Sequence, residues 1–169
     1  LFHAALDQAQ TDPSVRVIGL SGAGDKAFCA GADLGGGMDA DSLAVFKSYA
    51  ALLKRIAGYS KPTVARVNGY CLAGGMGLML ACDIVIADRS AIFSITEARW
   101  GVMAGPIFPQ LNACMGQHNV RRYALTCERF GPRQAHAMGL VNAVCPVGEL
   151  DATAAPLIEA ILSGGPAAL

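Results

Sequence analysis

The chain has 169 residues, a length typical of one folded domain with a sizeable core. Only 15% of the residues are charged and 53% are hydrophobic, which excludes a disordered chain and suggests that parts of the surface are covered by partners. The 13 basic and 13 acidic residues give a net charge of zero, so no overall field attracts nucleic acid or an anionic membrane.

Hydrophobic patterning predicts alternating strands and helices along the chain. Apolar runs bounded by turn residues predict buried strands at residues 15–20, 63–67, 84–87, 91–95 and 140–144. Apolar residues at helical spacing predict a helix that starts at Asp41 or Ser42 and continues past Ile56. Further helices are predicted at residues 76–82, 110–115, 119–127, 132–138 and 150–162. This order predicts an α/β fold with parallel strands covered by helices.

The sequence shows neither a membrane span nor a secretion signal. The longest uncharged stretch, residues 100–120, is interrupted by prolines and glycines and is not expected to span a bilayer. The chain opens without a basic region followed by an apolar one, so we expect a cytoplasmic protein that binds no membrane. The six cysteines stand singly, without CxxC or CxxH spacing, which predicts reduced core residues and no metal site.

Both ends of the sequence suggest a core domain without its flanks. A helical pattern through Phe2, Leu6 and Ala9 begins with no capping residue before it. A predicted helix near the other end stops at a Ser-Gly-Gly-Pro segment, after which apolar residues continue. We therefore expect residues 1–169 to be one core domain that lacks neighbouring elements at both ends.

Residues 22–27 (GAGDKA) follow a predicted strand and match the dinucleotide-binding pattern G-x-G-x-x-[GA]. That pattern requires a helix directly after the glycines. The residues that follow here contain too much glycine for a helix, so we do not expect a dinucleotide site.

Two glycine-dense stretches, residues 30–37 and 69–77, each come after a predicted strand of what we expect to be one sheet. Adjacent parallel strands would bring them together at the edge where α/β proteins bind ligands. Because glycine permits close approach of the backbone, the N–H groups of Ala30 and Gly74 could point at one spot and bind an anion. The alternative is that these glycines only form tight turns.

Glu97 follows an apolar strand and precedes the apolar residues Trp100 and Val102. Desolvation in such a setting would raise the pKa of its carboxyl group, which makes Glu97 a candidate general base. The alternative is a surface ion pair with Arg89 or Arg99.

Other titratable side chains favour structural roles. The three histidines, at positions 3, 118 and 136, have no cysteine or serine neighbour arranged for nucleophilic chemistry. Asp83 ends an apolar helix just before a strand, where a hydrogen-bonding role is expected.

Four segments together resemble the crotonase superfamily, the enoyl-CoA hydratase/isomerase family. They are KAFCAGADL (26–34), KPTVARVNGYCLAGGMGLMLACDIVIA (61–87), FSITEARWGV (93–102) and GPRQAHAMGLVNAVCP (131–146). The resemblance covers nearly the whole chain and implies a spiral of ββα units. Family members carry an additional N-terminal strand and C-terminal helices, in agreement with the incomplete ends.

The resemblance also implies a substrate and an assembly. Family members are homotrimers or homohexamers that act on acyl-CoA thioesters. No separate cofactor or metal is implied, because coenzyme A is part of the substrate. Nucleic acid is not an expected partner.

The resemblance further assigns roles to individual residues. The N–H groups of Ala30 and Gly74 would stabilise a thioester enolate, and Glu97 would be the general acid and base. Gly105, in the segment MAGP, matches a glycine near the water site. The loop that borders the adenine of coenzyme A in the family corresponds here to Phe28, Ala30, Ala32, Asp33 and Leu34.

One position departs from the family pattern and leaves the reaction open. Family hydratases usually have a second glutamate where this chain has Gly77. A single carboxylate is enough for a Δ3,Δ2-enoyl-CoA isomerase, whereas the surrounding sequence is similar to bacterial branched enoyl-CoA hydratases of the methylglutaconyl-CoA type. Hydration is the favoured prediction and isomerisation the alternative. A non-catalytic acyl-CoA-binding scaffold is a further alternative, because Gly77 removes a catalytic group.

Overall fold

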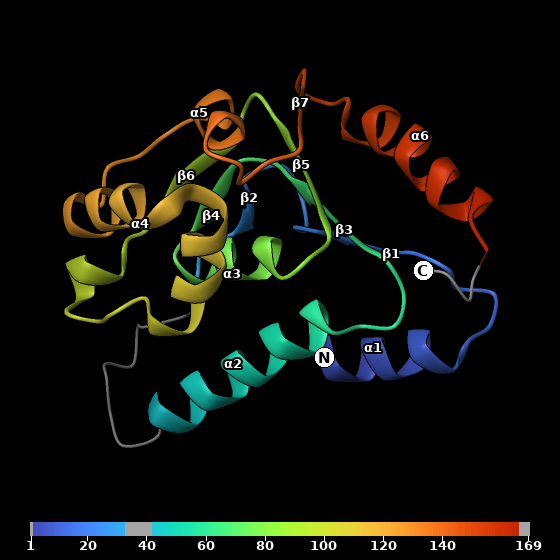
Figure 1. The fold of residues 1–169 in the computed structure, drawn as a ribbon, viewed down its shortest axis with the longest axis horizontal. Coiled ribbons are helices and arrows are strands. Elements are labelled where there is room, and N and C mark those ends of the chain that lie inside the picture. Colours follow the sequence, from blue (N-terminus) through green and yellow to red (C-terminus); the bar gives the residue numbers. More distant parts are fainter. Residues whose placement is uncertain (1, 33–41, 166–169) are drawn as a thin grey trace.

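The computed structural model describes residues 2–32 and 42–165, in which the chain alternates between two parallel sheets (Figure 1). The four-stranded sheet has the order β1 (Ile18–Ser21), β3 (Thr63–Val67), β5 (Ile84–Asp88) and β7 (Ala143–Cys145). The three-stranded sheet has the order β2 (Ala27–Cys29), β4 (Tyr70–Leu72) and β6 (Ile92–Ser94). Odd-numbered strands thus belong to one sheet and even-numbered strands to the other.

Helices follow pairs of strands and cover the sheets. They are α1 (Phe2–Thr11), α2 (Ser42–Ala57), α3 (Gly74–Leu80), the 3-10 helices η1 (Glu97–Trp100) and η2 (Gly105–Ile107), α4 (Phe108–Thr126), α5 (Pro132–Ala137) and α6 (Leu150–Ser163). In Figure 1, α1 and α2 lie below the sheets, α4 and α5 at the upper left, and α6 along the right flank. The successions β1-β2-α2 and β3-β4-α3 are ββα units, which confirms the expected α/β architecture of parallel sheets covered by helices.

Most of the predicted elements are present, but η1 and η2 were not predicted, and the strand predicted at residues 140–144 is observed at Ala143–Cys145. Strand β3 has the predicted bounds, and α2 covers the predicted amphipathic segment. The two helices predicted at 110–115 and 119–127 are joined in α4, whose backbone leaves helical geometry at Gly116 (φ 73°, ψ 154°). Strand β1 spans Ile18–Ser21, so the strand predicted at residues 15–20 began three residues too early and ended one residue too early.

The prediction of a single sheet was wrong. Strands β2 and β4 lie at or within the glycine-dense stretches, and β4 pairs with β2 on one side and with β6 on the other in a separate sheet. The segment after the G-x-G pattern enters β2 rather than the helix that a dinucleotide site requires.

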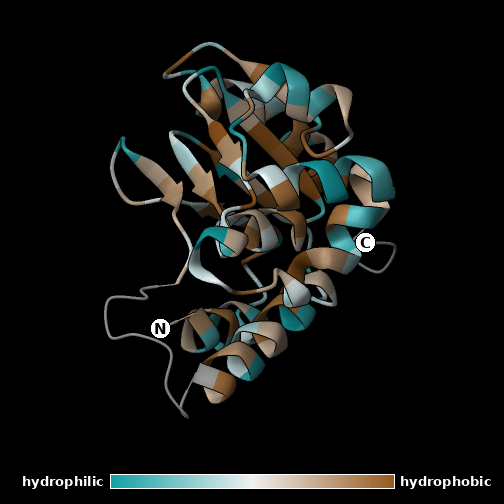
Figure 2. Cartoon of the chain, turned by 90° about the vertical axis from the view of Figure 1, so that its left-hand side faces the viewer, coloured by the Kyte–Doolittle hydropathy of each residue, from teal (hydrophilic) through white to brown (hydrophobic). Residues whose placement is uncertain are grey.

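The core consists of apolar side chains from both sheets and from the helix faces turned toward them. Val64, Ala65 and Val67 of β3 are fully buried, as is Met76 of α3. Figure 2 shows the hydrophobic colours gathered on the central strands, with hydrophilic residues on the outer helices. Four cysteines are buried and Cys29 is half-buried, but the expectation of a core position was wrong for Cys114, which is exposed on α4.

Asp83 connects the end of α3 to the start of β3. Its Oδ2 accepts hydrogen bonds from the Thr63 N–H at 2.7 Å and from Thr63 Oγ1 at 2.8 Å. The Asp83 N–H in turn donates to Thr63 Oγ1 at 3.0 Å. These bonds give Asp83 the structural role expected for it.

Candidate active site

The three residues with the strongest chemical signals follow the three strands of the smaller sheet. Ala30 comes directly after β2, Gly74 begins α3 just after β4, and Glu97 begins η1 shortly after β6. Since β2, β4 and β6 are parallel neighbours, their carboxyl ends share one edge of the sheet. Ligands of α/β proteins bind at such edges.

Glycines allow the chain after β2 and the start of α3 to touch. A Cβ atom built on Gly31 would lie 3.1 Å from Ala73 Cβ and 3.6 Å from the Gly74 nitrogen. One built on Gly75 would lie 2.1 Å from the Cys29 carbonyl oxygen, a distance that no side chain tolerates. The glycines therefore do more than form turns, because a close approach of the two segments depends on them.

Two backbone N–H groups at this contact have no hydrogen-bond acceptor among the described residues. Within residues 2–32 and 42–165, neither the Ala30 nor the Gly74 N–H donates a hydrogen bond. Ala73, just before Gly74, has the positive φ of 48° that L-residues rarely adopt. Bonds from its N–H to the Ser94 carbonyl at 3.0 Å and from the Met76 N–H to its own carbonyl at 2.9 Å hold this conformation. Strain of this kind costs about 1–3 kcal/mol and is concentrated at functional sites.

Glu97 is half-buried, and its Oε2 is buried with no hydrogen-bond partner among the described residues. Burial raises the pKa of its carboxyl group, an effect that the backbone N–H groups of Glu97 and Thr96 partly offset. The alternative of a surface ion pair finds no support in the described part of the chain. Arg99 instead donates to the Cys127 carbonyl at 2.9 Å, and Arg89 forms no salt bridge there.

Gly77 lies in a space already filled by other side chains. A Cβ atom there would be 2.3 Å from Ile107 Cγ2, 2.3 Å from the Tyr49 hydroxyl oxygen and 3.2 Å from Leu53 Cδ1. The Tyr49 hydroxyl donates a hydrogen bond to the Gly74 carbonyl. The structure thus brings a phenol from α2 to the first turn of α3.

Sequence reasoning missed both Tyr49 and Ile107. Tyr49 belongs to the apolar stripe of α2 and reads as an ordinary core residue. Ile107 is an apolar residue in a segment without regular periodicity. Only their packing around a glycine distant in the sequence reveals them.

The remaining predicted site residues have more varied surroundings. Gly105 begins η2, and a Cβ atom there would meet only Met103 Cε, at 3.7 Å. Phe28 is buried in the main core, whereas Ala30 and Ala32 are exposed beyond the end of β2. Asp33 and Leu34, also predicted to border coenzyme A, lie outside the described residues.

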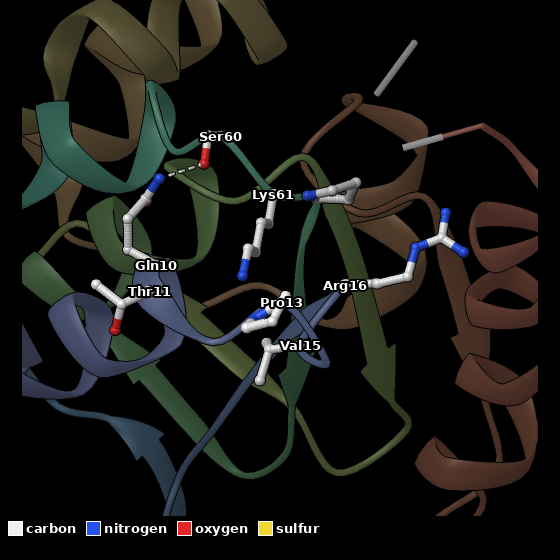
Figure 3. A pocket seen from close by; sticks show the side chains of 8 residues that line it. Gln10, Thr11, Pro13, Val15, Arg16, Ser60 and Lys61 are labelled. Carbon is white, nitrogen blue, oxygen red and sulfur yellow. Dashed lines mark hydrogen bonds between the residues drawn. The ribbon is translucent and has the colours of Figure 1, made fainter. Parts of the chain in front are cut away.

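Two cavities lie apart from Glu97. One of about 290 Å³, drawn in Figure 3, lies between the end of α1 and the segments around Arg16 and Lys61. Lys61 Nζ donates to the Ala9 and Asp12 carbonyls at 2.5 and 2.7 Å, and Arg16 donates to the Leu162 and Gly164 carbonyls. These cations are thus engaged in joining elements of the fold. The second cavity, of about 540 Å³, lies between the start of α1 and α2 and is lined in part by Tyr49.

The described residues contain no cluster of three or more potential metal ligands. None of the described helices has both the length and the apolar character needed to cross a membrane.

Known proteins match this chain over almost its entire length. A sequence profile described as enoyl-CoA hydratase/isomerase matches residues 2–169. A Thermus thermophilus protein assigned as an enoyl-CoA hydratase is 38% identical over 98% of this chain and 67% of its own. A mevalonyl-coenzyme A hydratase of Aspergillus fumigatus is 36% identical over 92% of this chain and 59% of its own.

A solved structure gives the same result. The crystal structure of an enoyl-CoA hydratase from Shewanella pealeana matches with a TM-score of 0.90 and 33% identity, over 98% of this chain and 63% of that one. The chain therefore spans 59% to 67% of the length of these three proteins. The profile match and the shared fold show that the chain belongs to the enoyl-CoA hydratase/isomerase family, the crotonase superfamily.

Proposed function

We propose that the protein adds water to an enoyl-CoA thioester, or removes it, through an enolate held by the Ala30 and Gly74 N–H groups. In the addition, the oxygen of water bonds to the β-carbon while Glu97 accepts one of the water protons. The electron pair of the double bond moves toward the thioester carbonyl, whose oxygen becomes the enolate oxygen. Glu97 then returns the proton to the α-carbon, which restores the carbonyl and leaves a 3-hydroxyacyl-CoA.

The chemistry explains why these groups are needed. Negative charge develops on the thioester oxygen only during the reaction, so fixed N–H donors favour the transition state over the substrate. One such donor contributes about 3–4 kcal/mol. A carboxylate with a pKa raised by burial is a stronger base than an exposed one and can also return the proton.

The observation that carries the proposal is the arrangement at the carboxyl edge of the smaller sheet. Two N–H groups follow β2 and β4, and a buried carboxylate oxygen follows β6; none of the three has a hydrogen-bond partner within the described parts of the chain. The names of the relatives favour hydration, because two of those reported are assigned as enoyl-CoA hydratases and one as a mevalonyl-coenzyme A hydratase.

Isomerisation is the second candidate, and Gly77 is the observation that favours it. With no side chain at this position, Glu97 is the only carboxylate that the family motifs assign to the site. A single carboxylate can carry a proton between two carbons of a dienolate and requires no water. Gly105 would leave space near either reacting carbon.

Isotope labelling distinguishes these reactions. The protein is incubated with 2-enoyl-, 3-enoyl- and 3-methylglutaconyl-CoA in oxygen-18 water and, separately, in deuterium oxide, and the thioesters are analysed by mass spectrometry. We expect one labelled oxygen in the product of hydration. Deuterium in a substrate isomer without added oxygen would instead establish an isomerase, and tight binding with no change in any thioester would establish a scaffold.

Replacing Glu97 tests the assigned acid and base. Glu97→Gln keeps the shape of the side chain but cannot accept the proton, so turnover should be lost while acyl-CoA still binds. Turnover is measured with the substrate identified by labelling, and binding by isothermal titration. Full activity of the variant would remove Glu97 from the mechanism.

The same family membership leads us to propose a homotrimer or homohexamer. Trp100, the last residue of η1, is 64% exposed, and Met103, shortly after it, is 70% exposed. Burial of these apolar side chains between subunits would stabilise an assembly. Light scattering coupled to size exclusion measures the mass of the assembly, and a monomer at micromolar concentration would contradict the proposal.

A further inference from the structure

A phenol oxygen occupies the place into which a side chain at position 77 would point. The Tyr49 hydroxyl lies 2.3 Å from where a Cβ atom of residue 77 would be. Ile107 Cγ2 lies at the same distance and closes the space from another direction. A polar atom from α2 therefore stands beside the backbone of the residue that departs from the family pattern.

The hydrogen bond of this phenol determines what its oxygen can still do. The Tyr49 O–H donates to the Gly74 carbonyl, so its single proton is engaged. The ring also packs close to Gly74: a Cβ atom on this residue would lie 3.4 Å from both Tyr49 Cζ and the hydroxyl oxygen. The lone pairs of the oxygen are then left as acceptors with a fixed direction.

The charge of the Glu97 carboxylate acts on the Tyr49 phenol. Burial raises the pKa of the Tyr49 phenol far above its usual value, and the charges of Cys29 and Glu97 raise it further. Tyr49 therefore stays neutral and keeps its proton on the Gly74 carbonyl. Glu97 Oε2 is also buried and has no partner among the described residues.

We propose that Tyr49 replaces the missing second carboxylate as an acceptor for the water that is added to the substrate. The water would donate one hydrogen bond to the Tyr49 oxygen and its other proton to Glu97, which directs a lone pair of the water at the β-carbon. No proton moves to Tyr49 in this step. The water proton that leaves is taken by Glu97 and returned to the α-carbon, so the reaction balances as described above.

This inference rests on the proposed hydration, and it differs from a purely structural role for Tyr49. A phenol that only fixed α3 through the Gly74 carbonyl would affect every reaction that uses the Gly74 N–H. A phenol that holds the water would affect hydration alone. Exchange of the α-proton of a saturated acyl-CoA with deuterium oxide requires Glu97 and the enolate but no added water, and so separates the two roles.

The test compares Tyr49→Phe with the unchanged protein in both reactions. We expect kcat for hydration to fall about 10- to 100-fold with little change in KM, because a misplaced nucleophile slows a reaction to this extent. The α-proton exchange should stay within about threefold of the unchanged protein, since proton transfer by Glu97 is unaffected. A parallel loss of both reactions would show a structural role, and unchanged hydration would show no role. Either result overturns the proposal.

Tyr59→Phe is a matched control. The Tyr59 hydroxyl donates to the Leu6 carbonyl at 2.5 Å, so this variant also removes a tyrosine-to-carbonyl hydrogen bond, but between α1 and the chain after α2. We expect it to lower the melting temperature and to leave kcat for hydration unchanged. A loss of hydration equal to that of Tyr49→Phe would contradict a specific role for Tyr49.

Two further measurements keep the test decisive. If Tyr49→Phe does not fold, 3-fluorotyrosine at position 49 retains the ring and the hydroxyl but makes the oxygen a weaker acceptor. Hydration alone should then slow, and an unchanged rate would overturn the proposal. The labelling experiment on the unchanged protein comes first. If that protein hydrates no thioester, the proposed function fails, and the role of Tyr49 in hydration fails with it.

Discussion

Adding a single methyl group at position 77 should destabilise the protein, although the same change stabilises most helices. Gly77 is buried inside α3, and a helix interior favours alanine over glycine by about 1 kcal/mol. A Cβ atom here would lie 2.3 Å from both Ile107 Cγ2 and the Tyr49 hydroxyl oxygen. Ile107 is 1% exposed and branched at Cβ, so its methyl group cannot rotate away without moving its neighbours.

The size of the destabilisation follows from the balance between the helix preference for alanine and the overpacking against Ile107 and Tyr49. Overpacking of a core costs about 1–3 kcal/mol, and two simultaneous contacts place Gly77→Ala at the upper end of that range. After subtraction of the helix preference, we expect a loss of about 2 kcal/mol in the free energy of unfolding. For a chain of this size, that corresponds to a melting temperature lower by about 4–8 °C.

Urea and thermal unfolding at one fixed protein concentration measure this loss, since the stability of an oligomer depends on concentration. Gly19→Ala is the control, because a Cβ atom at this position in β1 meets nothing within 4 Å. The control should be neutral or slightly stabilising. A melting temperature of Gly77→Ala equal to or above that of the unchanged protein would refute the packing described around Gly77.

A double variant identifies which neighbour causes the strain. Tyr49→Phe removes the hydroxyl oxygen but leaves Ile107 in place. If the oxygen contributes to the clash, Gly77→Ala should cost less in the Tyr49→Phe background by about 0.5–3 kcal/mol, the range typical of residues in contact. Strictly additive effects would show that Ile107 alone excludes a side chain at position 77.

Three further predictions concern the charge of Glu97, the N–H donor of Gly74 and the structural role of Asp83. Burial raises the pKa of the Glu97 carboxyl above its usual 4.5, so the folded protein favours the protonated form and the ionised form costs stability. Glu97→Gln should therefore melt at a higher temperature than the unchanged protein at pH 7. The difference in melting temperature should disappear as the pH falls toward 4.5. A constant difference across this range would contradict the burial of the charge. Gly74→Pro removes the N–H donor at a helix position that tolerates proline. Binding of enolate-like thioester analogues, measured by titration, should therefore be lost. Normal turnover by a folded variant would exclude Gly74 as a donor. Asp83→Ala removes the bonds of 2.7 and 2.8 Å from Thr63 and should lower the free energy of unfolding by about 2 kcal/mol with kcat unchanged, which denaturation and turnover assays check.

The sequence was most informative where a local pattern decides the structure. Strand β3 is a run of apolar and β-branched residues between Pro62 and Asn68, and both the expected bounds and the observed bounds follow from that pattern. Strands β2 and β4 were missed because each has only three residues and lies in or beside a glycine-rich stretch. Their extended conformation depends on pairing between distant segments, such as the bond from the Tyr70 N–H to the Lys26 carbonyl at 3.0 Å, which no local pattern reports.

In the candidate site, too, local sequence patterns indicated some residues and gave no sign of others. Ala30, Gly74 and Glu97 could be singled out because glycine density and an acidic residue in an apolar segment are visible in the sequence. Their shared position at one edge of a sheet could be expected only in part, because β2, β4 and β6 form a sheet separate from the single one that the sequence predicted. Tyr49 could not be found at all, because a tyrosine in an amphipathic stripe looks the same whether it fills a core or lines a site.

The absence of a carboxylate at position 77 therefore does not by itself indicate a lost activity. If the glycine were a simple deletion of a side chain, a cavity would remain at this point, and restoring glutamate would fill it. The space is instead occupied by Tyr49 and Ile107, so Gly77→Glu would force both out of place and disturb the α3 turn that presents the Gly74 N–H. The residues at positions 49, 77 and 107 therefore depend on one another. The reaction has to be inferred from the side chain that fills the space beside Gly77. That group is a phenol whose proton is engaged and whose oxygen can accept, which is the property that a second acceptor for water requires.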